Sequence, residues 1–372
     1  MKKILFLHPD LRGGGAEKVL INMINKLDSA KYNITLYTIF EEGVNKKLLT
    51  PNVEHKFIFR KVFRAWSIIQ KIFTPSFLFK HIVGQNYDLV VAYLEGVPTR
   101  IVGGCNNNST RIISWIHVDL GGFSIENTFR SKNEMKNIYL KYDAIVGVSN
   151  TALESLKFKI PSLPSKKLHV LHNVLDTDLI MTKGNELVKD INFSSNTINL
   201  CSVGRLTHQK GYIRLLKILA KLAAEKYNFH LYLVGDGEDR DQLIKIIQTQ
   251  NLQNHITLLG FKDNPHKYVK NCDLFICSSY QEGFSTAVTE CVLLGTPVIT
   301  TNCAGMEEIL VNGKYGKIVN NTDEDLYIGL KEFLKNKEYL SKYKNLTMQR
   351  SKELQNKNNI SEIEKLFDKI LN

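Results

Sequence analysis

The chain has 372 residues, of which 43% are hydrophobic and 23% are charged, and its formal net charge is +12. This length exceeds that of a typical domain with one hydrophobic core and favours two domains. The hydrophobic content is ample for globular folding. No stretch approaches the length of a membrane-spanning helix, and the opening "MKKILFLHPD" is predicted to be a strand rather than a signal peptide. Six cysteines without zinc spacing indicate free thiols in a reducing cytoplasm.

The first predicted strand, "KKILFLH" at 2–8, runs into the glycine loop "LRGGGAEK", and the apolar stripe after the loop predicts a helix. Gly13, Gly14 and Gly15 allow a tight turn and close approach of a ligand to the backbone. Free N–H groups and the positive end of the helix dipole suit a phosphate or a sugar oxygen. The pattern is neither a dinucleotide-binding fingerprint nor a P-loop, and glycines that serve only the turn are an equally good interpretation.

A basic aromatic segment at 56–83 follows the second predicted strand, at 33–39. No acidic residue lies between Glu54 and Asp88. Basic and aromatic side chains together favour contact with a bilayer interface that carries anionic lipid. A helix-rich segment with solvated lysines outside is the alternative, and no recognised motif supports nucleic acid. The basic residues of the segment are Lys56, Arg60, Lys61, Arg64, Lys71 and Lys80.

Further strands of the first half are predicted at 87–94, 111–117, 142–149 and 168–173, with helical patterns between several of them. Strands that alternate with helices predict a parallel sheet covered on both faces. His117 ends the strand "RIISWIH" and therefore lies at the edge of the sheet where ligands bind. It could bind a sugar hydroxyl or sit beside a reacting centre, although a lone histidine is more often structural.

The polar stretch at 175–196 predicts the connection between two domains. It contains "DTD" at Asp176–Asp178, a chance match to a metal-binding sequence, and no metal site is expected. Two doubly wound domains in tandem would leave a ligand-binding cleft between the carboxyl ends of their strands. After about residue 330 the chain turns helical. The strands of the second half are predicted at 198–204, 229–235, 255–260, 272–278 and 296–301.

Arg205 and Lys210 bracket a short polar loop in "CSVGRLTHQKGY". The planar fork of arginine and the point charge of lysine can neutralise a diphosphate without a metal. A solvated basic loop is an equally good interpretation of these two residues alone.

Two glutamates frame a Gly-Phe-Ser turn in "SSYQEGFSTAVTE", with Glu282 predicted in a loop and Glu290 in the helix that follows. Two helical turns span roughly 11 Å, comparable to the reach from the sugar to the ribose of a nucleotide-sugar. One carboxylate could bind sugar hydroxyls and the other both ribose hydroxyls. The backbone N–H groups that would face a diphosphate between them are those of Gly283, Phe284 and Ser285.

Together these motifs resemble the retaining glycosyltransferases of GT-B architecture, specifically glycosyltransferase family 4 with its E-x7-E motif. The resemblance covers nearly the whole chain, because "GGGAE", "WIH", "SVGRLTHQKG", "LVGDG", "LLGF" and "EGFSTAVTE" occur in the family's order. It implies two Rossmann-like α/β domains facing across a cleft. We expect an acceptor-binding domain at 1–175, a nucleotide-sugar-binding domain at 176–355, and a helix at 356–372 that can return to the first domain.

In the first half, the resemblance places Gly14 and Gly15 near the donor phosphates and sugar. His117 would approach the anomeric centre and the sugar hydroxyls of the donor. The hinge strand reads "HNVLD" where many relatives have "NGVD", so Asn173 and Asp176 are not counted as site residues.

In the second half, the resemblance implies that Arg205 and Lys210 bind the diphosphate. Glu282 would contact the sugar hydroxyls of the donor, and Glu290 would hold the ribose. The backbone near Phe261 would meet the base. His117 and Glu282 are the expected catalytic residues.

The resemblance implies a retaining, metal-independent transfer from a nucleotide-sugar, expected to be UDP-linked, to a lipid-linked or cell-surface polysaccharide such as capsule or O-antigen. No cofactor and no nucleic acid are expected. The enzyme would be cytoplasmic and peripheral on the inner face of a bacterial plasma membrane. A UDP-sugar epimerase or a phosphorylase on the same fold, and a noncatalytic sugar-nucleotide-binding protein, are the alternatives.

Overall fold

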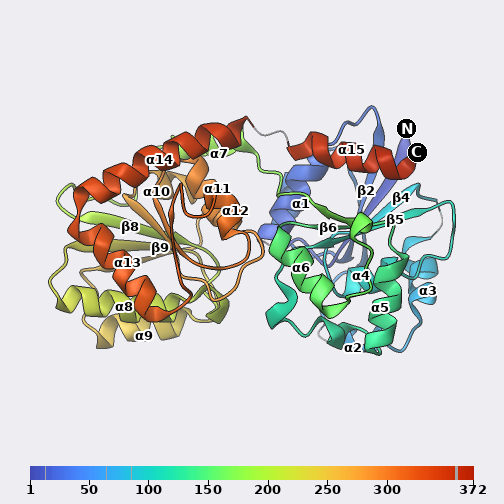
Figure 1. Cartoon of the computed structure of the whole chain (residues 1–372), viewed down its shortest axis with the longest axis horizontal. Helices are drawn as coiled ribbons and strands as arrows, with labels where there is room; N and C mark the ends of the chain where they lie inside the picture. The colour runs from blue at the N-terminus through green and yellow to red at the C-terminus, as the bar shows by residue number, and fades with distance from the viewer. Residues whose placement is uncertain (13, 64, 85, 357–358) are drawn as a thin grey trace. The chain divides into compact units, whose positions relative to one another are not determined.

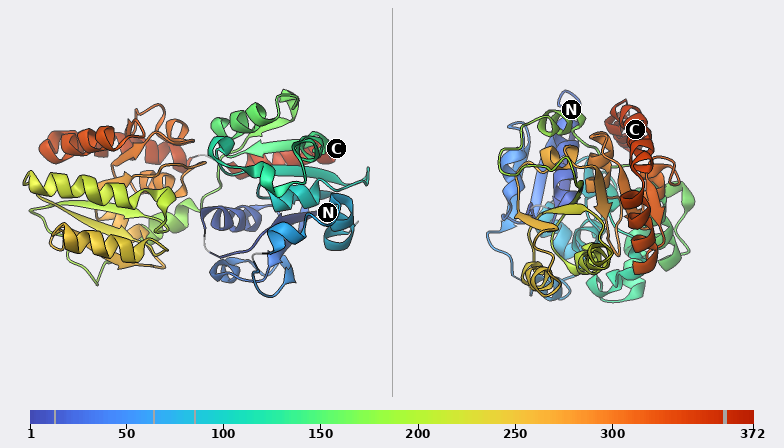
Figure 2. Two further views of the ribbon diagram at one scale, coloured as in Figure 1. Left: turned by 90° about the horizontal axis from the view of Figure 1, so that it is seen from below. Right: turned by 90° about the vertical axis from the view of Figure 1, so that its left-hand side faces the viewer.

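The structure is a computed structural model that describes residues 1–12, 14–63, 65–84, 86–356 and 359–372. The chain divides into two compact units (Figure 1). Unit 1 comprises Met1–Leu175 and Asn358–Asn372, and unit 2 comprises Asp176–Lys357. Both termini therefore belong to unit 1 (Figure 2).

Unit 1 is built on a parallel sheet of seven strands within the described residues. These are β1 (Lys2–His8), β2 (Tyr32–Phe40), β3 (Glu54–Phe59), β4 (Leu89–Ala92), β5 (Arg111–Ile116), β6 (Ala144–Gly147) and β7 (Leu168–Val170). Their order is β3-β2-β1-β4-β5-β6-β7. The central strand β4 is buried along its whole length, as expected when helices cover both faces of a sheet.

The main helices of unit 1 follow the predicted pattern of strands alternating with helices. Serine caps fix two of their starts, because Ser131 accepts from the N–H of Glu134 and Ser149 accepts from that of Ala152. The helices are α1 (Gly15–Lys26), α2 (Trp66–Ile69), α3 (Pro75–Leu78), α4 (Val97–Val102), α5 (Lys132–Lys141), α6 (Asn150–Lys159) and α15 (Asn359–Leu371), with short turns at η1 (Val44–Leu48), η2 (Phe79–Val83), η3 (Leu120–Gly122), η4 (Ile125–Thr128) and η5 (Ser165–Lys167).

The C-terminal helix α15 packs against the rest of unit 1 through the buried side chains of Ile363, Leu366 and Phe367. Phe367 is fully buried, and its ring centroid lies 6.2 Å from those of both Phe6 and Tyr32. The Tyr32 hydroxyl donates to Asp368 at 2.6 Å, which fixes the register of the helix against β2. The last residues of the chain thus complete the core that the first residues begin.

Unit 2 is built on a second parallel sheet, which has six strands in the part of the chain that the structure describes. They are β8 (Ile198–Val203), β9 (Phe229–Val234), β10 (Ile256–Gly260), β11 (Leu274–Cys277), β12 (Val298–Thr301) and β13 (Lys317–Val319), in the order β10-β9-β8-β11-β12-β13. The helices are α7 (Thr177–Gly184), η6 (His208–Lys210), α8 (Tyr212–Ala224), α9 (Arg240–Thr249), α10 (His266–Lys270), α11 (Thr286–Leu293), α12 (Met306–Leu310), α13 (Asp323–Lys335) and α14 (Lys337–Gln355). They lie on both faces of the sheet (Figure 1).

Two segments differ from the sequence-based expectation. The basic aromatic segment begins inside β3, a half-buried strand that pairs only with β2, so its first residues extend the sheet instead of forming a helix. The "DTD" sequence lies at the start of α7, where the Asp176 carboxylate accepts from the N–H of Leu179 at 3.3 Å. Helix capping therefore accounts for its first aspartate.

A buried arginine holds the middle of the basic aromatic segment. Arg100 of α4 is fully buried, and its guanidinium donates to the backbone carbonyls of Gln70 and Phe73 and to the Glu134 carboxylate. The shortest of these contacts, to Gln70, is 2.7 Å. Arg130 donates to the backbone carbonyls of Lys71 and Ile72 in the same turn, so two arginines fix the connection between α2 and α3. Among the described residues, no helix is both long and apolar enough to cross a membrane.

Candidate active site

A buried ion pair in unit 2 joins two of the predicted site residues. The Lys210 ammonium donates to Oε1 of Glu282 at 2.7 Å, and Glu282 is only 7% exposed. Burial works to lower the pKa of Lys210, but the Glu282 charge and its neighbours raise that pKa overall. Lys210 therefore keeps its charge in a poorly solvated place, where the contact with Glu282 stabilises it.

The backbone beyond β11 is held so that Glu282 faces Lys210. The Ser279 hydroxyl donates to Oε1 of Glu282 at 2.6 Å. The Ser279 carbonyl in turn accepts from the Thr301 hydroxyl at 2.6 Å and from the Arg214 guanidinium at 2.7 Å. All these contacts to the Glu282 carboxylate use Oε1, so Oε2 is the oxygen that a ligand would meet.

Arg214 supports the backbone of the candidate site, and the sequence-based reasoning missed it. It lies in the buried face of α8, is 2% exposed, donates also to the Ser278 carbonyl at 2.8 Å, and stacks over the Tyr280 ring at 4.0 Å. A signal was present, because an arginine at a core position of an apolar helix needs buried partners. Gly211, with φ of +67°, brings this helix close: a Cβ there would lie 2.0 Å from the Ser278 carbonyl oxygen.

Glu290 lies on α11, and the structure gives it a partner that the sequence did not indicate. Oε2 of Glu290 is 3.6 Å from Nδ1 of His266, and the two side chains are 12% and 4% exposed. The helix begins as predicted: Ser285 is its N-cap and accepts from the N–H of Val288 at 3.3 Å. Gly283 is buried and Phe284 half-buried in the turn that joins the two glutamates.

Arg205 and Phe261 are predicted site residues of unit 2 whose side chains remain exposed. Arg205 lies in the loop between β8 and η6, and Lys210 is the last residue of η6. Phe261 directly follows β10 and is 66% exposed. Both are accessible to a ligand, and their roles stay predictions.

In unit 1, His117 lies directly after β5 in a buried position. Its backbone N–H donates to Oε2 of Glu95 at 2.9 Å, and its ring lies 4.6 Å from that of Tyr93. Burial lowers the pKa of His117 to about 3, so the imidazole is neutral at physiological pH. Burial also raises the pKa of Glu95 to about 7, which makes this carboxyl group able to titrate near neutrality.

Gly14 and Gly15 open α1, with Gly14 at the N-cap. The carboxylate of Glu17 folds back over this turn, since a Cβ on Gly14 would lie 2.2 Å from Oε2 of Glu17. A negative group thus already occupies the positive end of the helix dipole. Gly13 lies outside the described residues.

The basic aromatic segment exposes apolar side chains beside its cations. Ile68 and Ile72 are 69% and 71% exposed, and the Phe77 ring, 44% exposed, stacks at 4.0 Å on that of His81. Of the predicted acceptor or membrane residues, Arg60 and Lys61 are exposed, Lys71 is half-buried and Arg64 lies outside the described residues.

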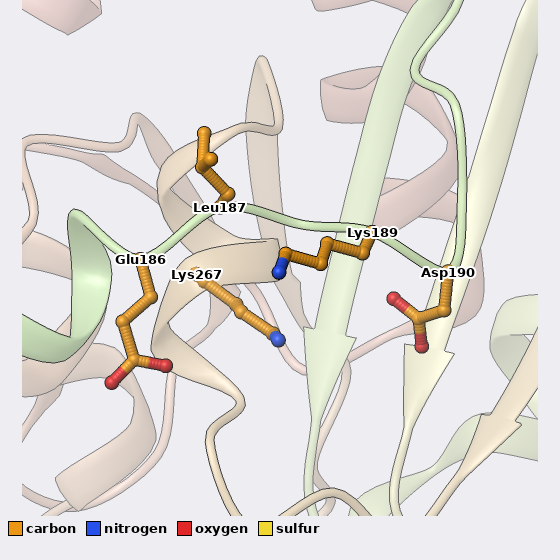
Figure 3. Close-up of a pocket in the computed structure, with 5 residues that line it drawn as sticks. All are labelled: Glu186, Leu187, Lys189, Asp190 and Lys267. Atoms are coloured by element: carbon orange, nitrogen blue, oxygen red, sulfur yellow. The ribbon is translucent and has the colours of Figure 1, made fainter.

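A pocket of about 540 Å³ opens beside α10 in unit 2, but it contains none of the predicted site residues (Figure 3). Its two lysines point toward one another. The Asp190 carboxylate pairs with Lys262 at 2.6 Å, on the protein surface. We do not place the active site there. The lining residues are Glu186, Leu187, Lys189, Asp190 and Lys267.

Two units with parallel sheets and flanking helices define the GT-B fold, and solved structures match the chain along its length. HepE of Anabaena, in complex with UDP and glucose, aligns with a TM-score of 0.78 at 19% identity over 100% of this chain and 99% of that chain. WaaG, a glycosyltransferase involved in lipopolysaccharide biosynthesis, aligns with a TM-score of 0.71 at 14% identity over 99% of each chain. The predicted fold is confirmed.

Sequence relatives identify the family. An N-acetylgalactosamine-N,N'-diacetylbacillosaminyl-diphospho-undecaprenol 4-alpha-N-acetylgalactosaminyltransferase of Campylobacter jejuni is 30% identical over 72% of this chain and 69% of its own. An uncharacterised glycosyltransferase of Methanocaldococcus jannaschii is 28% identical over 78% of this chain and 73% of its own. Residues 185–350 match the family described as glycosyl transferases group 1. The chain belongs to this family, which confirms the prediction of a glycosyltransferase.

Proposed function

We propose that this glycosyltransferase moves a sugar from a nucleotide-sugar, expected to be UDP-linked, to a lipid-linked or cell-surface saccharide, with retention and without a metal. The observation that carries the proposal is the buried Lys210–Glu282 pair. The name of the Campylobacter relative, which specifies a diphospho-undecaprenol acceptor, and the UDP bound to HepE agree with it.

Unit 2 would bind the donor by its paired charges. Lys210 and the exposed Arg205 neutralise the charge that develops on the departing diphosphate, in a place where burial strengthens electrostatic interactions. Oε2 of Glu282 accepts hydroxyls of the donor sugar, since Oε1 is already held by Lys210 and Ser279. Glu290 accepts the ribose hydroxyls, and His266 steadies its carboxylate.

The same pairing bears on the chemistry of retention. A covalent glycosyl intermediate needs a reactive nucleophile, and the Lys210 ammonium and the Ser279 hydroxyl, both bound to Oε1, lower the nucleophilicity of the Glu282 carboxylate. We therefore favour attack on the face from which the diphosphate leaves, with the departing phosphate helping to deprotonate the acceptor hydroxyl. Rapid-quench kinetics should show no burst of nucleotide release, and a trapped glycosyl-enzyme would contradict this mechanism.

Donor hydrolysis tests the proposed function. The protein is incubated with a panel of UDP-, GDP- and ADP-sugars, with and without EDTA. We expect slow, EDTA-resistant release of one nucleotide. Glu290→Ala should mainly raise the donor KM, whereas Glu282→Ala should lower kcat, and Glu324→Ala, an exposed glutamate on α13, is the matched control. If both active-site variants turn over at the parent rate, the assignment of the E-x7-E pair is wrong.

Membrane contact is the second part of the proposal, at the inner face of a bacterial plasma membrane. The exposed side chains of Ile68, Ile72 and Phe77 supply apolar area, and the cations of the basic aromatic segment supply attraction to anionic lipid. Flotation with vesicles of phosphatidylglycerol and phosphatidylcholine tests this. Ile72→Ser with Phe77→Ser should abolish flotation, while Phe158→Ser, 87% exposed on α6, should not. Flotation that survives neutralisation of Lys61 and Lys71 would contradict the role of charge.

A further inference from the structure

Two buried histidines of unit 1 each carry a ring nitrogen without a hydrogen-bond partner in the described part of the chain. His8 ends β1 and is 2% exposed, and His117 follows β5 and is 9% exposed. The unpartnered atom is Nε2 in both. Leaving a buried polar atom unpaired is costly, so two such atoms in one neighbourhood indicate a ligand that pairs with them.

The contacts of the rings show what each Nε2 atom offers. Nδ1 of His8 lies 2.7 Å from the Asp10 carbonyl oxygen. A carbonyl oxygen only accepts, so Nδ1 carries the hydrogen and Nε2 of the neutral ring is a bare lone pair. For His117, a backbone hydrogen bond at Tyr93 acts to raise the pKa of the ring, as an accepting carbonyl does. Burial lowers the pKa of both imidazoles, which keeps them neutral.

The sheet brings the two rings to one place. β4 lies between β1 and β5, and both histidines stand at the carboxyl ends of their strands. The Tyr93 ring at the end of β4 lies 6.3 Å from that of His8 and 4.6 Å from that of His117. A charge on His8 would lower the pKa of His117, so the rings are electrostatic neighbours.

Their surroundings select the kind of ligand. The described residues contain no group of three His, Cys, Asp or Glu side chains arranged for a metal ion. Carboxylates of Glu17 and Asp10 act on His8, and Arg12 pairs with Asp10 at 2.9 Å, so the charge there is partly balanced. A phosphate dianion has no hydrogen to donate to bare lone pairs. Hydroxyl groups, which donate hydrogen bonds and carry no charge, fit both requirements.

We propose that Nε2 of His8, beside the His117 ring already expected to bind sugar hydroxyls, accepts a hydrogen bond from a hydroxyl of the bound saccharide, and that His8 is a specificity-determining residue for the acceptor sugar. This inference rests on the proposed function for the identity of the ligand as an acceptor. The binding step itself requires no nucleotide and no transfer.

The test separates the two nitrogens of His8. An asparagine side chain can replace Nδ1 and its bond to the Asp10 carbonyl but leaves the Nε2 position empty, whereas glutamine reaches that position. His8→Asn should therefore weaken saccharide binding at least about tenfold, and His8→Gln should stay within about threefold of the parent. His55→Asn is the control, since this half-buried histidine of β3 also has an unpartnered ring nitrogen.

Binding is measured on the full chain with 15N-labelled histidine by NMR. Methyl glycosides of glucose, galactose, N-acetylglucosamine and N-acetylgalactosamine are titrated, and the fluorescence of Trp66 and Trp115, both in unit 1, checks that unit 1 of each variant is folded. We expect one glycoside to shift both Nε2 resonances. An Nε2 that carries the hydrogen, no shift with any glycoside, or parent affinity in His8→Asn would overturn the inference.

Kinetics distinguish this inference from the proposed function. With a working acceptor, His8→Asn should raise the acceptor KM at least about tenfold and leave the donor KM and donor hydrolysis unchanged. If no nucleotide-sugar is hydrolysed while a glycoside still shifts the two histidines, the proposed function fails and the subsite stands. If transfer proceeds and His8→Asn changes neither binding nor KM, only the subsite is refuted.

Discussion

Neutralising Glu282 should destabilise unit 2, independently of any effect on turnover. In Glu282→Gln the amide keeps an acceptor for Lys210 and Ser279, so only the charge is lost. The pair is 2.7 Å apart, and its side chains are 8% and 25% exposed. The gross attraction at this distance is about 6 kcal/mol with an effective dielectric constant of about 20, and the cost of desolvating both ions offsets most of it.

An unpaired buried cation destabilises the folded state by more than the ion pair stabilises it. Glu282→Gln leaves Lys210 partly buried and unpaired, and we expect a loss of about 2 to 3 kcal/mol. Lys210→Met in the same background removes the stranded charge. The double variant should therefore recover about 2 kcal/mol relative to the sum of the single variants.

The assay must report unit 2 alone. Both tryptophans, Trp66 and Trp115, lie in unit 1, so their fluorescence does not serve. Hydrogen exchange by mass spectrometry does, because the slowest amides of β8 and β11 exchange through unfolding of that unit. Glu282→Gln should speed their exchange about 30- to 150-fold, with peptides of β4 and β5 unchanged as an internal control. Unchanged exchange in unit 2, or strictly additive single effects, would refute the reasoning.

Three further predictions concern stability. Burial raises the pKa of Glu95 from 4.5 to about 7, so unit 1 should lose up to about 3 kcal/mol of unfolding free energy as pH rises from 4.5 to 7. Urea titrations followed by tryptophan fluorescence measure this loss, and Glu95→Gln should flatten it. An unchanged dependence of the unfolding free energy on pH in Glu95→Gln would contradict the prediction. Arg100→Met should cost unit 1 about 3 to 5 kcal/mol in the same assay, because Glu134 loses its partner; a loss below 1 kcal/mol would count against this. Gly211→Ala should lower the stability of unit 2, measured by hydrogen exchange, by about 2 kcal/mol or more, because of its left-handed φ and the clash with Ser278. Gly260→Ala, with φ of +69° and open space around the new Cβ, should lower it by about 1 kcal/mol. Equal losses of stability in the two variants would exclude the clash.

Long-period features of the sequence predict the fold well. Buried parallel strands are continuous apolar runs in the sequence, and most of them are visible without the structure. Because helical patterns separate these runs, they were enough to predict two parallel sheets. β3 was not predicted, because exposed and half-buried residues alternate along this edge strand. Its Lys56 also belongs to the basic segment that resembles an amphipathic helix. β13 was not predicted because its apolar run is only Ile318–Val319, whereas the pattern around β7, a strand of equal length, continues to Leu171.

Some residues of the candidate site could be predicted from the sequence, and others could not. Glu282 and Lys210 are visible in the sequence because each stands beside a glycine turn, but their pairing joins residues 72 positions apart and only the fold reveals it. Arg214 is hidden in the sequence by the apolar pattern of α8, and His266 opens a helix of only five residues that carries no periodic pattern. His8 looks like an ordinary last residue of a strand, and only the empty contact at its Nε2 marks it.

The return of α15 to unit 1 affects the order in which the chain can fold during synthesis. Unit 2 is continuous in sequence, so it can complete its core soon after Gln355 leaves the ribosome. Unit 1 must wait for the final helix, and until then the faces of Phe6 and Tyr32 that meet Phe367 are uncovered. The N-terminal unit, although made first, is thus the last to be finished, and a ribosome stalled before α15 would hold it in an unfinished state.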